Sequence, residues 1–390
     1  MIDLKAVRAD TMGCRHTLHF DNAGAALMPT PVFDAVQHHL RLERFLGGQE
    51  AARRSQPDLE AFYHQFAGLL NAQPEEIAYL ENATRAWDMA FYGLRLEPGD
   101  RIITHGSEYA SNFLGFLHLA KKKQVEIDIA PSDRSGQLDV EALERLITAK
   151  TRVIAITHVP TQGGLVNPAE RVGDVARRYG LIYILDACQS VGQIDVDVEK
   201  IGCHVLTGTG RKFLRGPRGT GFLYMQRDLI KTVEPPFIDL KAATWTEDFD
   251  YVWRDDARKF ENWESNVAGR VGLAHAVEYA RGIGMKVIEE RVQKLGAALR
   301  TSLKSVPGVQ VCDLGEKKCG IVTFKKEGIP SSSVAEKLRE QAMNVSVSSV
   351  EYARLDLGAR GTGPVVRASA HYYNSEQEVE TFVAAVANLK

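Results

Sequence analysis

The chain has 390 residues, of which 44% are hydrophobic and 25% are charged, and its formal net charge is −2. This is the composition of an ordinary globular protein, and the near-neutral charge gives no reason to expect a nucleic acid or an anionic membrane as partner. No apolar run approaches the roughly 20 residues that span a bilayer, and the first residues lack the apolar stretch of a secretory signal.

Between residues 101 and 225 the chain alternates β-type and helical runs. Helical runs begin at Asp139 and at Pro168, and the second ends on Gly180. Alternation of this kind predicts a mostly parallel sheet with helices on both faces, and ligands then bind beyond the carboxyl ends of the strands. Six short apolar, β-branched runs predict the strands: RIITHG at Arg101, VEIDIA at Val125, RVIAITHVP at Arg152, LIYILDA at Leu181, HVLTGTG at His204 and GTGFLYM at Gly219.

After about Trp245 the pattern changes. The segment WTEDFDYVWRDDARKFENWESN is aromatic and charged, and it has no clear strand or helix period. A long helical run then extends from Val267 to Lys304, interrupted by Gly282 and Gly284.

The rest of the chain mixes strands and helices. Its β-type runs are GIVTFKKEG, NVSVSS and PVVRASAHYYN. One helix is predicted to start on a capping box of Ser333 and Glu336, and a terminal helix is predicted from Ser375. We therefore predict an α/β protein with an N-terminal arm over residues 1–20, a large domain over 21–255 and a smaller α+β domain over 256–390.

An acidic residue at a strand end and a lysine in a later turn carry the strongest chemical signal. Asp186 ends a strand in ILDACQSVG, and Lys212 follows 26 residues later in the Gly/Thr-rich stretch TGTGRKFLRG. A lysine amine can form a Schiff base with the aldehyde of pyridoxal phosphate, and a carboxylate can keep the pyridine nitrogen protonated. A protonated ring accepts electrons from the substrate's α-carbon. With Gln189 three residues after the aspartate, the pattern predicts pyridoxal phosphate as the cofactor.

The stretch NATRAWDMAF predicts where the phosphate of that cofactor binds. Asn82 fits a turn leading into a helix, whose first backbone N–H groups have no partner inside the helix. Ala83 and Thr84 would donate these groups to an anion, and the threonine hydroxyl would add a bond. Helix capping alone is the plainer interpretation, and both can hold because the capping position is also the anion site.

Together these motifs resemble the class V aminotransferase family, which includes cysteine desulfurases, selenocysteine lyases and isopenicillin epimerase-like proteins. The resemblance runs from HFDNAGAALMP at His19 to VRASAHYYNSEQE near the C-terminus, with the motifs in the family's order. It implies the fold-type I architecture, a large domain with a mostly parallel seven-stranded sheet followed by a smaller α+β domain. It also implies an amino-acid substrate and a homodimer with composite active sites, because FENWESN at Phe260 matches a segment that the neighbouring subunit contributes.

The resemblance assigns three residues to the cofactor ring. Asp186 matches the partner of the ring nitrogen, Gln189 the contact of the phenolic oxygen, and Lys212 the Schiff-base lysine. Tyr109, in GSEYASNFLGF, takes the place of a histidine that stacks on the ring, so an aromatic face is kept and a proton-shuttling imidazole is not. A core tyrosine is the alternative. Thr161, in HVPTQGG, stands near the cofactor where the family often has an asparagine.

Other assignments concern the phosphate and the substrate. Thr209, Gly210 and Arg211 match the turn that holds the phosphate, where a hydroxyl and a guanidinium fork suit an anion. A surface salt bridge is the alternative for Arg211. Arg367, in PVVRASAHYYN, matches the arginine that grips the substrate's α-carboxylate, with an internal salt bridge as the alternative. Asn22, in FDNAGAA, matches a motif over the substrate entrance.

A missing cysteine argues against one of the reactions that this cofactor supports. Cysteine desulfurases carry a nucleophilic cysteine on a loop shortly before the carboxylate-binding arginine, whereas NVSVSSVEYARLDLGARGTGP contains none. A serine cannot carry sulfane sulfur as a thiolate does, which excludes a persulfide relay through this loop. Cys188, between Asp186 and Gln189, is expected to pack rather than to react.

We therefore predict a carbon–sulfur lyase that eliminates sulfur from an S-substituted cysteine or its sulfoxide, with Lys212, Asp186 and Tyr109 as catalytic residues. The C-terminal pattern looks most like the subgroup that includes hercynylcysteine-sulfoxide lyase-type proteins of ergothioneine synthesis. An epimerase or aminotransferase of an unusual amino acid stays open, as does a non-catalytic homologue that only binds. The five cysteines form no CxxC pair, which favours reduced thiols in a cytoplasmic protein, and no metal site is expected.

Overall fold

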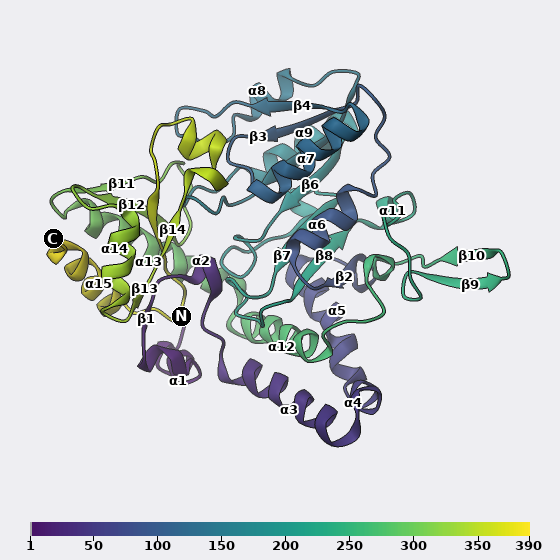
Figure 1. The fold of residues 1–390 in the computed structure, drawn as a ribbon, viewed down its shortest axis with the longest axis horizontal. Coiled ribbons are helices and arrows are strands. Elements are labelled where there is room, and N and C mark those ends of the chain that lie inside the picture. The colour runs from purple at the N-terminus through teal and green to yellow at the C-terminus, as the bar shows by residue number, and fades with distance from the viewer. Residues whose placement is uncertain (1) are drawn as a thin grey trace.

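The six predicted strands and one more form a seven-stranded sheet in the computed structural model, which describes residues 2–390 (Figure 1). The strand order is β2-β8-β7-β6-β5-β3-β4, and neighbours from β7 to β4 are parallel, whereas β8 runs antiparallel to β7 and to β2. The prediction of a mostly parallel sheet is confirmed. The strands are β2 (Ile77–Leu80), β3 (Arg101–His105), β4 (Glu126–Ala130), β5 (Thr151–Thr157), β6 (Ile182–Asp186), β7 (Val205–Thr209) and β8 (Gly221–Met225).

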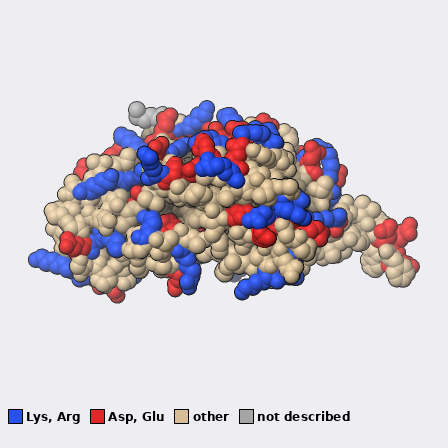
Figure 2. Space-filling model, turned by 90° about the horizontal axis from the view of Figure 1, so that it is seen from above, with Lys and Arg blue, Asp and Glu red and all other residues tan. Residues whose placement is uncertain are grey.

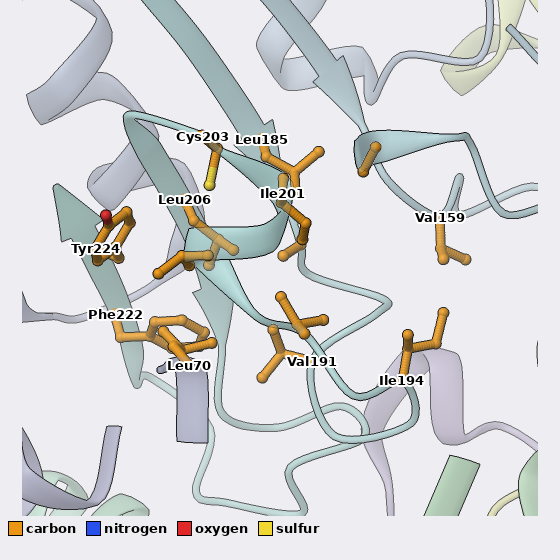
Figure 3. Packing of buried hydrophobic residues seen from close by; sticks show 14 of the residues in the cluster. Leu70, Val159, Leu185, Val191, Ile194, Ile201, Cys203, Leu206, Phe222 and Tyr224 are labelled. Atoms are coloured by element: carbon orange, nitrogen blue, oxygen red, sulfur yellow. The ribbon is translucent and has the colours of Figure 1, made fainter. Parts of the chain in front are cut away.

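The sheet is buried on both faces because its side chains alternate between two apolar clusters. In β6, Leu185 belongs to one cluster and Ile184 to the other, as expected when successive side chains point to opposite faces. Figure 3 shows Leu185 and Leu206 packed together in the first cluster. That cluster receives helices α5 (Gln56–Leu70), α9 (Ala169–Tyr179) and α12 (Val267–Ile283), and the second receives α6 (Ala83–Phe91) and α7 (Ala110–Lys123).

Helix α9 ends as the sequence predicts. Its N-cap is Pro168, and its C-cap Gly180 has a φ of 64°, a left-handed conformation that favours glycine. The remaining helices of this part are α2 (Asn22–Ala25), α3 (Thr30–Leu46), α4 (Gly48–Arg54), α8 (Val140–Arg145), α10 (Val198–Ile201) and α11 (Arg227–Ile230).

The C-terminal part carries a smaller antiparallel sheet with the order β11-β12-β15-β14. Its strands are β11 (Val309–Val311), β12 (Ile321–Lys326), β14 (Ser346–Ser348) and β15 (Val365–Ser369), and its helices are α13 (Met285–Lys304), α14 (Ser331–Arg339) and α15 (Glu376–Asn388). Leu299, Phe324 and Phe382 lie in a separate apolar cluster of this part. A smaller second α+β part is therefore confirmed, and the boundary at residue 255 stays a prediction.

The N-terminal residues are held by this smaller part. After α1 (Leu4–Ala9), strand β1 (Leu18–His19) pairs in parallel with β13 (Met343–Asn344). The ring of Phe20 lies 4.9 Å from that of Phe382, centroid to centroid. The residues that follow, Asp21 and Asn22, are thereby fixed next to the small sheet.

Two details differ from the sequence-based expectation. The segment around Trp245 forms an antiparallel hairpin of β9 (Ala243–Glu247) and β10 (Asp250–Trp253), which projects from the molecule in Figures 1 and 2. Because both of its faces are exposed, its sequence has no strand period. Helix α14 begins at Ser331, with Pro330 as its N-cap, so the capping box predicted at Ser333 is wrong.

The charged residues are dispersed over the surface. Figure 2 shows positive and negative side chains interspersed over the viewed face, with acidic side chains at the tip of the projecting hairpin. None of the helices within residues 2–390 has the length and apolar character needed to cross a membrane.

Candidate active site

The carboxyl ends of three neighbouring parallel strands border a cavity of about 80 Å³. Thr157 ends β5, Asp186 ends β6 and Thr209 ends β7. The individual roles of the residues around the cavity stay predictions, but the fold brings together all nine that the sequence assigned to the cofactor. They are Ala83, Thr84, Tyr109, Thr161, Asp186, Gln189, Thr209, Arg211 and Lys212.

Asp186 is buried, and separate donors hold its two carboxylate oxygens. The Asn112 Nδ2 donates to Oδ2 at 2.8 Å, and the backbone N–H of Cys188 donates to Oδ1 at 2.9 Å. Hydrogen bonds to an ionised acceptor are stronger than those between neutral groups, so this pair fixes the orientation of the carboxylate in the cavity wall.

Lys212 follows β7 and is buried in the same wall. Burial lowers the pKa of its amine, and the positive charges of Arg211 and Arg367 lower the pKa further, whereas Cys188 and Asp186 act in the opposite direction. A lowered pKa favours the neutral amine, which is the form that attacks a carbonyl carbon or accepts a proton.

The start of α6 borders the same cavity and is capped by a side chain. Asn82 is the N-cap, and its side-chain oxygen accepts a hydrogen bond from the backbone N–H of Arg85 at 2.9 Å, so the predicted capping is confirmed. The N–H groups of Ala83 and Thr84 belong to the first helical turn, where the helix offers them no partner. Gly221 permits this approach of α6 to β8, because a Cβ there would lie 2.6 Å from the carbonyl carbon of Asn82.

Arg211 contacts the backbone rather than an acidic side chain. Its guanidinium donates to the carbonyl of Gly24, and within residues 2–390 it makes no salt bridge, so the surface salt bridge considered from the sequence is absent there. Burial and the nearby charge of Arg218 lower the pKa of Arg211. Thr209, two residues before it, donates its hydroxyl to the carbonyl of Thr220 at 3.2 Å.

A chain of hydrogen bonds joins Gln189 to Arg367. Gln189 Nε2 donates to Thr161 Oγ1 at 3.1 Å, and Arg367 Nη1 donates to the same oxygen at 2.7 Å. Arg367 also forms an ion pair with Asp21, with 3.3 Å between Nη2 and Oδ1. Asp21 Oδ1 accepts a further hydrogen bond from the hydroxyl of Ser346 at 2.8 Å. The internal salt bridge considered for Arg367 is therefore present, with Asp21 as its partner.

A second cavity, of about 290 Å³, shares Tyr109 and Thr161 with the first. Arg367 lines this second cavity together with Tyr352 of the C-terminal part. Asn22 lines neither cavity and is fully buried; its side chain donates to the carbonyl of Ser369 at 2.6 Å and accepts a hydrogen bond from the hydroxyl of Tyr373. Its predicted place at the substrate entrance stays a prediction.

Three residues of the site, namely Glu108, Asn112 and Asp21, were not predicted from the sequence. Glu108 and Asn112 flank Tyr109 in GSEYASN, and this closeness to a predicted site residue was the available signal. Asp21 directly precedes Asn22, but nothing local in the sequence indicates its contact with Arg367, from which it is 346 residues distant.

Comparisons with known proteins place the chain in a family. A family model described as "Aminotransferase class-V" matches residues 18–382. The chain belongs to the class V aminotransferases. It is 30% identical to a probable cysteine desulfurase of Methanothermobacter thermautotrophicus, over 96% of this chain and 95% of that protein. It is equally 30% identical to a probable cysteine desulfurase of Pyrococcus abyssi, over 98% of this chain and 96% of that protein.

Solved structures of this class V aminotransferase's relatives share its fold. The apo structure of a cysteine desulfurase from Thermococcus onnurineus matches with a TM-score of 0.92 at 28% identity, over 99% of this chain and 98% of that one. A cystine C–S lyase in complex with its product cysteine persulfide matches with a TM-score of 0.87 at 20% identity, over 97% of this chain and 99% of that one. The fold-type I architecture expected from the sequence is confirmed.

As a class V aminotransferase, the chain is a pyridoxal phosphate enzyme that acts on an amino acid, which leaves no ground for the non-catalytic alternative. The cavity suits this cofactor. The N-terminus of α6 and Arg211 suit a phosphate, Asp186 suits a pyridine nitrogen, and Lys212 suits an aldehyde. The buried Gln189 Oε1 has no hydrogen-bond partner within residues 2–390, so the wall also keeps an acceptor for a bound group.

Proposed function

We propose that this class V aminotransferase is a carbon–sulfur lyase that eliminates a sulfur group from the β-carbon of an S-substituted cysteine or its sulfoxide. The observation that carries the proposal is the segment 344–364, which contains no cysteine. This segment borders the second cavity through Ser348, Ser349 and Tyr352. A sulfur-accepting thiol on this segment would lie close to the substrate, but these three residues carry hydroxyl groups instead.

Cys188 is a poor substitute for such a thiol, although it lines the first cavity. Burial raises the pKa of Cys188 well above its ordinary value, and the negative charge of Asp186 raises the pKa further. The thiolate is the form that attacks sulfur, and burial beside a carboxylate disfavours it. The sulfur group should therefore leave without ever being bonded to the chain.

The roles proposed for the cavity residues follow from their surroundings. When bound, the cofactor supplies a ring that stabilises electron density at the substrate's α-carbon. Lys212 would hold the cofactor and move the proton at that carbon, because burial favours its neutral amine. Asp186 would hold the pyridine nitrogen, and Tyr109 would offer its ring as a stacking surface.

Arg367 would bind the substrate's α-carboxylate with its guanidinium fork. That fork is paired with Asp21 in the structure, at 3.3 Å between Nη2 and Oδ1. A substrate carboxylate would replace the Asp21 carboxylate, one anion for another, so the buried guanidinium would keep a counter-charge throughout.

The finer assignment to a sulfoxide lyase of the ergothioneine type rests on the pattern of NVSVSS followed by VRASAHYYN. The five cysteines are all free, which supports the reduced, cytoplasmic setting proposed from their number.

A cysteine desulfurase is the second candidate function. Two relatives at 30% identity carry the name probable cysteine desulfurase, and they match nearly the whole chain. That reaction stores the sulfur on a thiol of the enzyme, so it predicts a persulfide on one of the five cysteines during turnover. The epimerase and aminotransferase alternatives predict no release of pyruvate.

We also propose that the active enzyme is a homodimer with composite sites. The projecting hairpin and the segment after it expose large aromatic side chains, with exposed fractions of 73% for Trp245 and 65% for Trp263 and with Phe249 fully exposed. Exposed aromatic residues gathered in this way are typical of protein–protein contacts, and a second copy of the chain is the partner that the FENWESN segment suggests.

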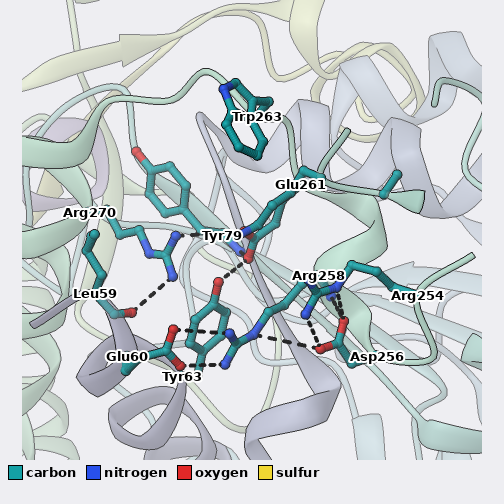
Figure 4. Close-up of polar contacts among 12 residues, drawn as sticks. Leu59, Glu60, Tyr63, Tyr79, Arg254, Asp256, Arg258, Glu261, Trp263 and Arg270 are labelled. Carbon is teal, nitrogen blue, oxygen red and sulfur yellow. Dashed lines mark hydrogen bonds and ion pairs between the residues drawn. The ribbon is translucent and has the colours of Figure 1, made fainter. Parts of the chain in front are cut away.

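The base of this projection is firmly held. Arg258 Nη2 lies 2.8 Å from Glu60 Oε2, and its guanidinium carbon lies 3.6 Å from the centroid of the Tyr63 ring (Figure 4). Glu261 accepts a hydrogen bond from the hydroxyl of Tyr63 at 2.8 Å, while Trp263 lies outside this network. A rigid base with exposed aromatic residues beyond it suits a preformed contact surface.

The proposed reaction is tested by its products. The enzyme, loaded with pyridoxal phosphate, is incubated separately with S-methyl-L-cysteine, its sulfoxide and L-cysteine, and pyruvate, ammonia and free thiol are measured. We expect pyruvate and ammonia in equal amounts from an S-substituted substrate. Inversion of the α-carbon without pyruvate would favour the epimerase, and the absence of pyruvate from every substrate would overturn the lyase proposal.

A further inference from the structure

A buried carboxyl group that the proposed chemistry does not use lies behind Asp186. Glu108 directly precedes the N-cap of α7. Its Oε1 accepts hydrogen bonds from the backbone N–H of Tyr109 at 2.9 Å, from Asn112 Nδ2 at 2.9 Å and from the hydroxyl of Thr157. This many donors on one buried oxygen indicate a site built to hold that carboxyl group.

Asn112 connects Glu108 to Asp186. Its Nδ2 lies 2.9 Å from Glu108 Oε1 and 2.8 Å from Asp186 Oδ2. A primary amide has two N–H hydrogens, so it can serve each carboxylate with one. Because Glu108 offers an acceptor here, it keeps the nitrogen of the amide, and not its oxygen, turned toward both carboxylates.

The same carboxyl group also fixes Tyr109. The backbone N–H of Tyr109 is shared between Glu108 Oε1 and Thr157 Oγ1, the latter at 3.1 Å. Thr157 and Asp186 are register partners at the ends of β5 and β6. Glu108 therefore ties the start of α7 to the strand ends that carry the cavity.

We propose that Glu108 is a positioning residue for the cofactor, which acts through Asn112 on the Asp186 carboxylate and through the backbone on Tyr109. The inference rests on the roles proposed above for Asp186 and Tyr109. The Asp186 carboxylate that Asn112 holds in this way would favour the protonated form of the ring nitrogen. Burial raises the pKa of Glu108 to about 7, and hydrogen bonds from Thr157 and Asn112 oppose this shift.

The test observes the ring nitrogen directly and needs no turnover. Pyridoxal phosphate labelled with ¹⁵N is bound to the wild type and to the variants Glu108→Gln, Asn112→Leu and Asp186→Asn, and the ¹⁵N chemical shift is measured. We expect the shift of the protonated nitrogen in the wild type and a movement toward the unprotonated value in all three variants. The affinity of the apoprotein for the cofactor should fall about tenfold in Asn112→Leu, since a charge-assisted hydrogen bond is lost.

Ser111→Ala is the matched control. Ser111 lies in the same turn of α7 as Asn112, and its hydroxyl makes no hydrogen bond within residues 2–390. It lines the second cavity but not the first, where the cofactor is proposed to bind, so this variant should keep the wild-type shift. If Asn112→Leu does not fold, the ¹⁵N shift of Glu108→Gln alone tests the inference. The inference is overturned if the folded Glu108 and Asn112 variants keep the wild-type ¹⁵N shift while Asp186→Asn changes it. That result would still support the role proposed for Asp186. An unchanged ¹⁵N shift in Asp186→Asn would overturn both this inference and the role proposed for Asp186.

Discussion

At the scale of single residues, Lys212 has the most specific predicted role. In Lys212→Ala, borohydride should no longer fix the cofactor to the chain and turnover should be lost, because no other amine lines the cavity described within residues 2–390. Mass spectrometry of the reduced protein measures the fixed cofactor. Lys259→Met is the control, since Lys259 is also buried but donates its amine to the carbonyl of Ile230. A fixed cofactor in Lys212→Ala would falsify the assignment.

Arg367 tests how the substrate is held. Arg367→Lys should raise the Michaelis constant of the amino acid by at least about tenfold, because an ammonium group cannot reproduce a bidentate fork. Steady-state kinetics on the preferred substrate measures this Michaelis constant. Arg360→Lys is a matched control, because Arg360 pairs with Asp356 at 2.6 Å and lines neither cavity. An unchanged Michaelis constant in Arg367→Lys would mean that another group binds the carboxylate.

At the scale of elements, the start of α7 should make stability depend on pH. The pKa of Glu108 is about 7 in the folded protein against 4.5 ordinarily, so the folded state keeps a proton that the unfolded state has lost. The resulting stabilisation is full below about pH 4.5 and is lost as the pH rises to about 7, a change of about 3 kcal/mol.

Glu108→Gln removes this titration. The free energy of unfolding of the apoprotein, measured by denaturant titration at several pH values, should fall in the wild type relative to this variant as the pH rises from 4.5 to 7. Above about pH 7 the difference should level off. A difference that does not change with pH would show that Glu108 titrates normally in the fold.

The β9–β10 hairpin should contribute to dimerisation. Replacing Trp245 and Phe249 together by aspartate places charges where exposed aromatic side chains are proposed to contact a second copy. Sedimentation velocity should then show a shift toward monomer, while Glu247→Gln on the same hairpin keeps the wild-type behaviour. A double variant that sediments as the wild-type dimer, or a wild type that is monomeric, would contradict the proposed role.

At the scale of the whole molecule, local patterns predicted most of the fold. Each run that predicted a strand between residues 101 and 225 became a strand of the large sheet. Burial on both faces requires continuous apolar runs in the inner strands, whereas the edge strand β4 is partly exposed. Asp186 and Lys212 could be predicted because the first ends a strand and the second follows one, and the carboxyl ends of parallel strands meet at one edge. Strand β2 is apolar and buried but only four residues long, and the exposed hairpin has no such run; both were missed.

Contacts between distant segments could not be predicted from local sequence patterns. The hydrogen bond from Asn112 to Asp186 joins residues 74 apart, and the ion pair of Arg367 with Asp21 joins residues 346 apart. No local sequence pattern indicates either contact, because the partners meet only after the strands are ordered and the N-terminal residues have paired with β13. The sequence could thus predict the residues that line the cavity better than those that orient them.

In the proposed reaction, sulfur leaves the substrate without passing through a thiol of the enzyme. This step is tested most directly by mass spectrometry of the intact wild-type chain, alkylated during turnover of an S-substituted cysteine and, separately, of L-cysteine. We expect no persulfide on any of the five cysteines, and continued turnover in a variant in which all five are replaced. A persulfide on the wild-type chain, or loss of turnover in a cysteine-free variant that still binds the cofactor normally, would contradict it.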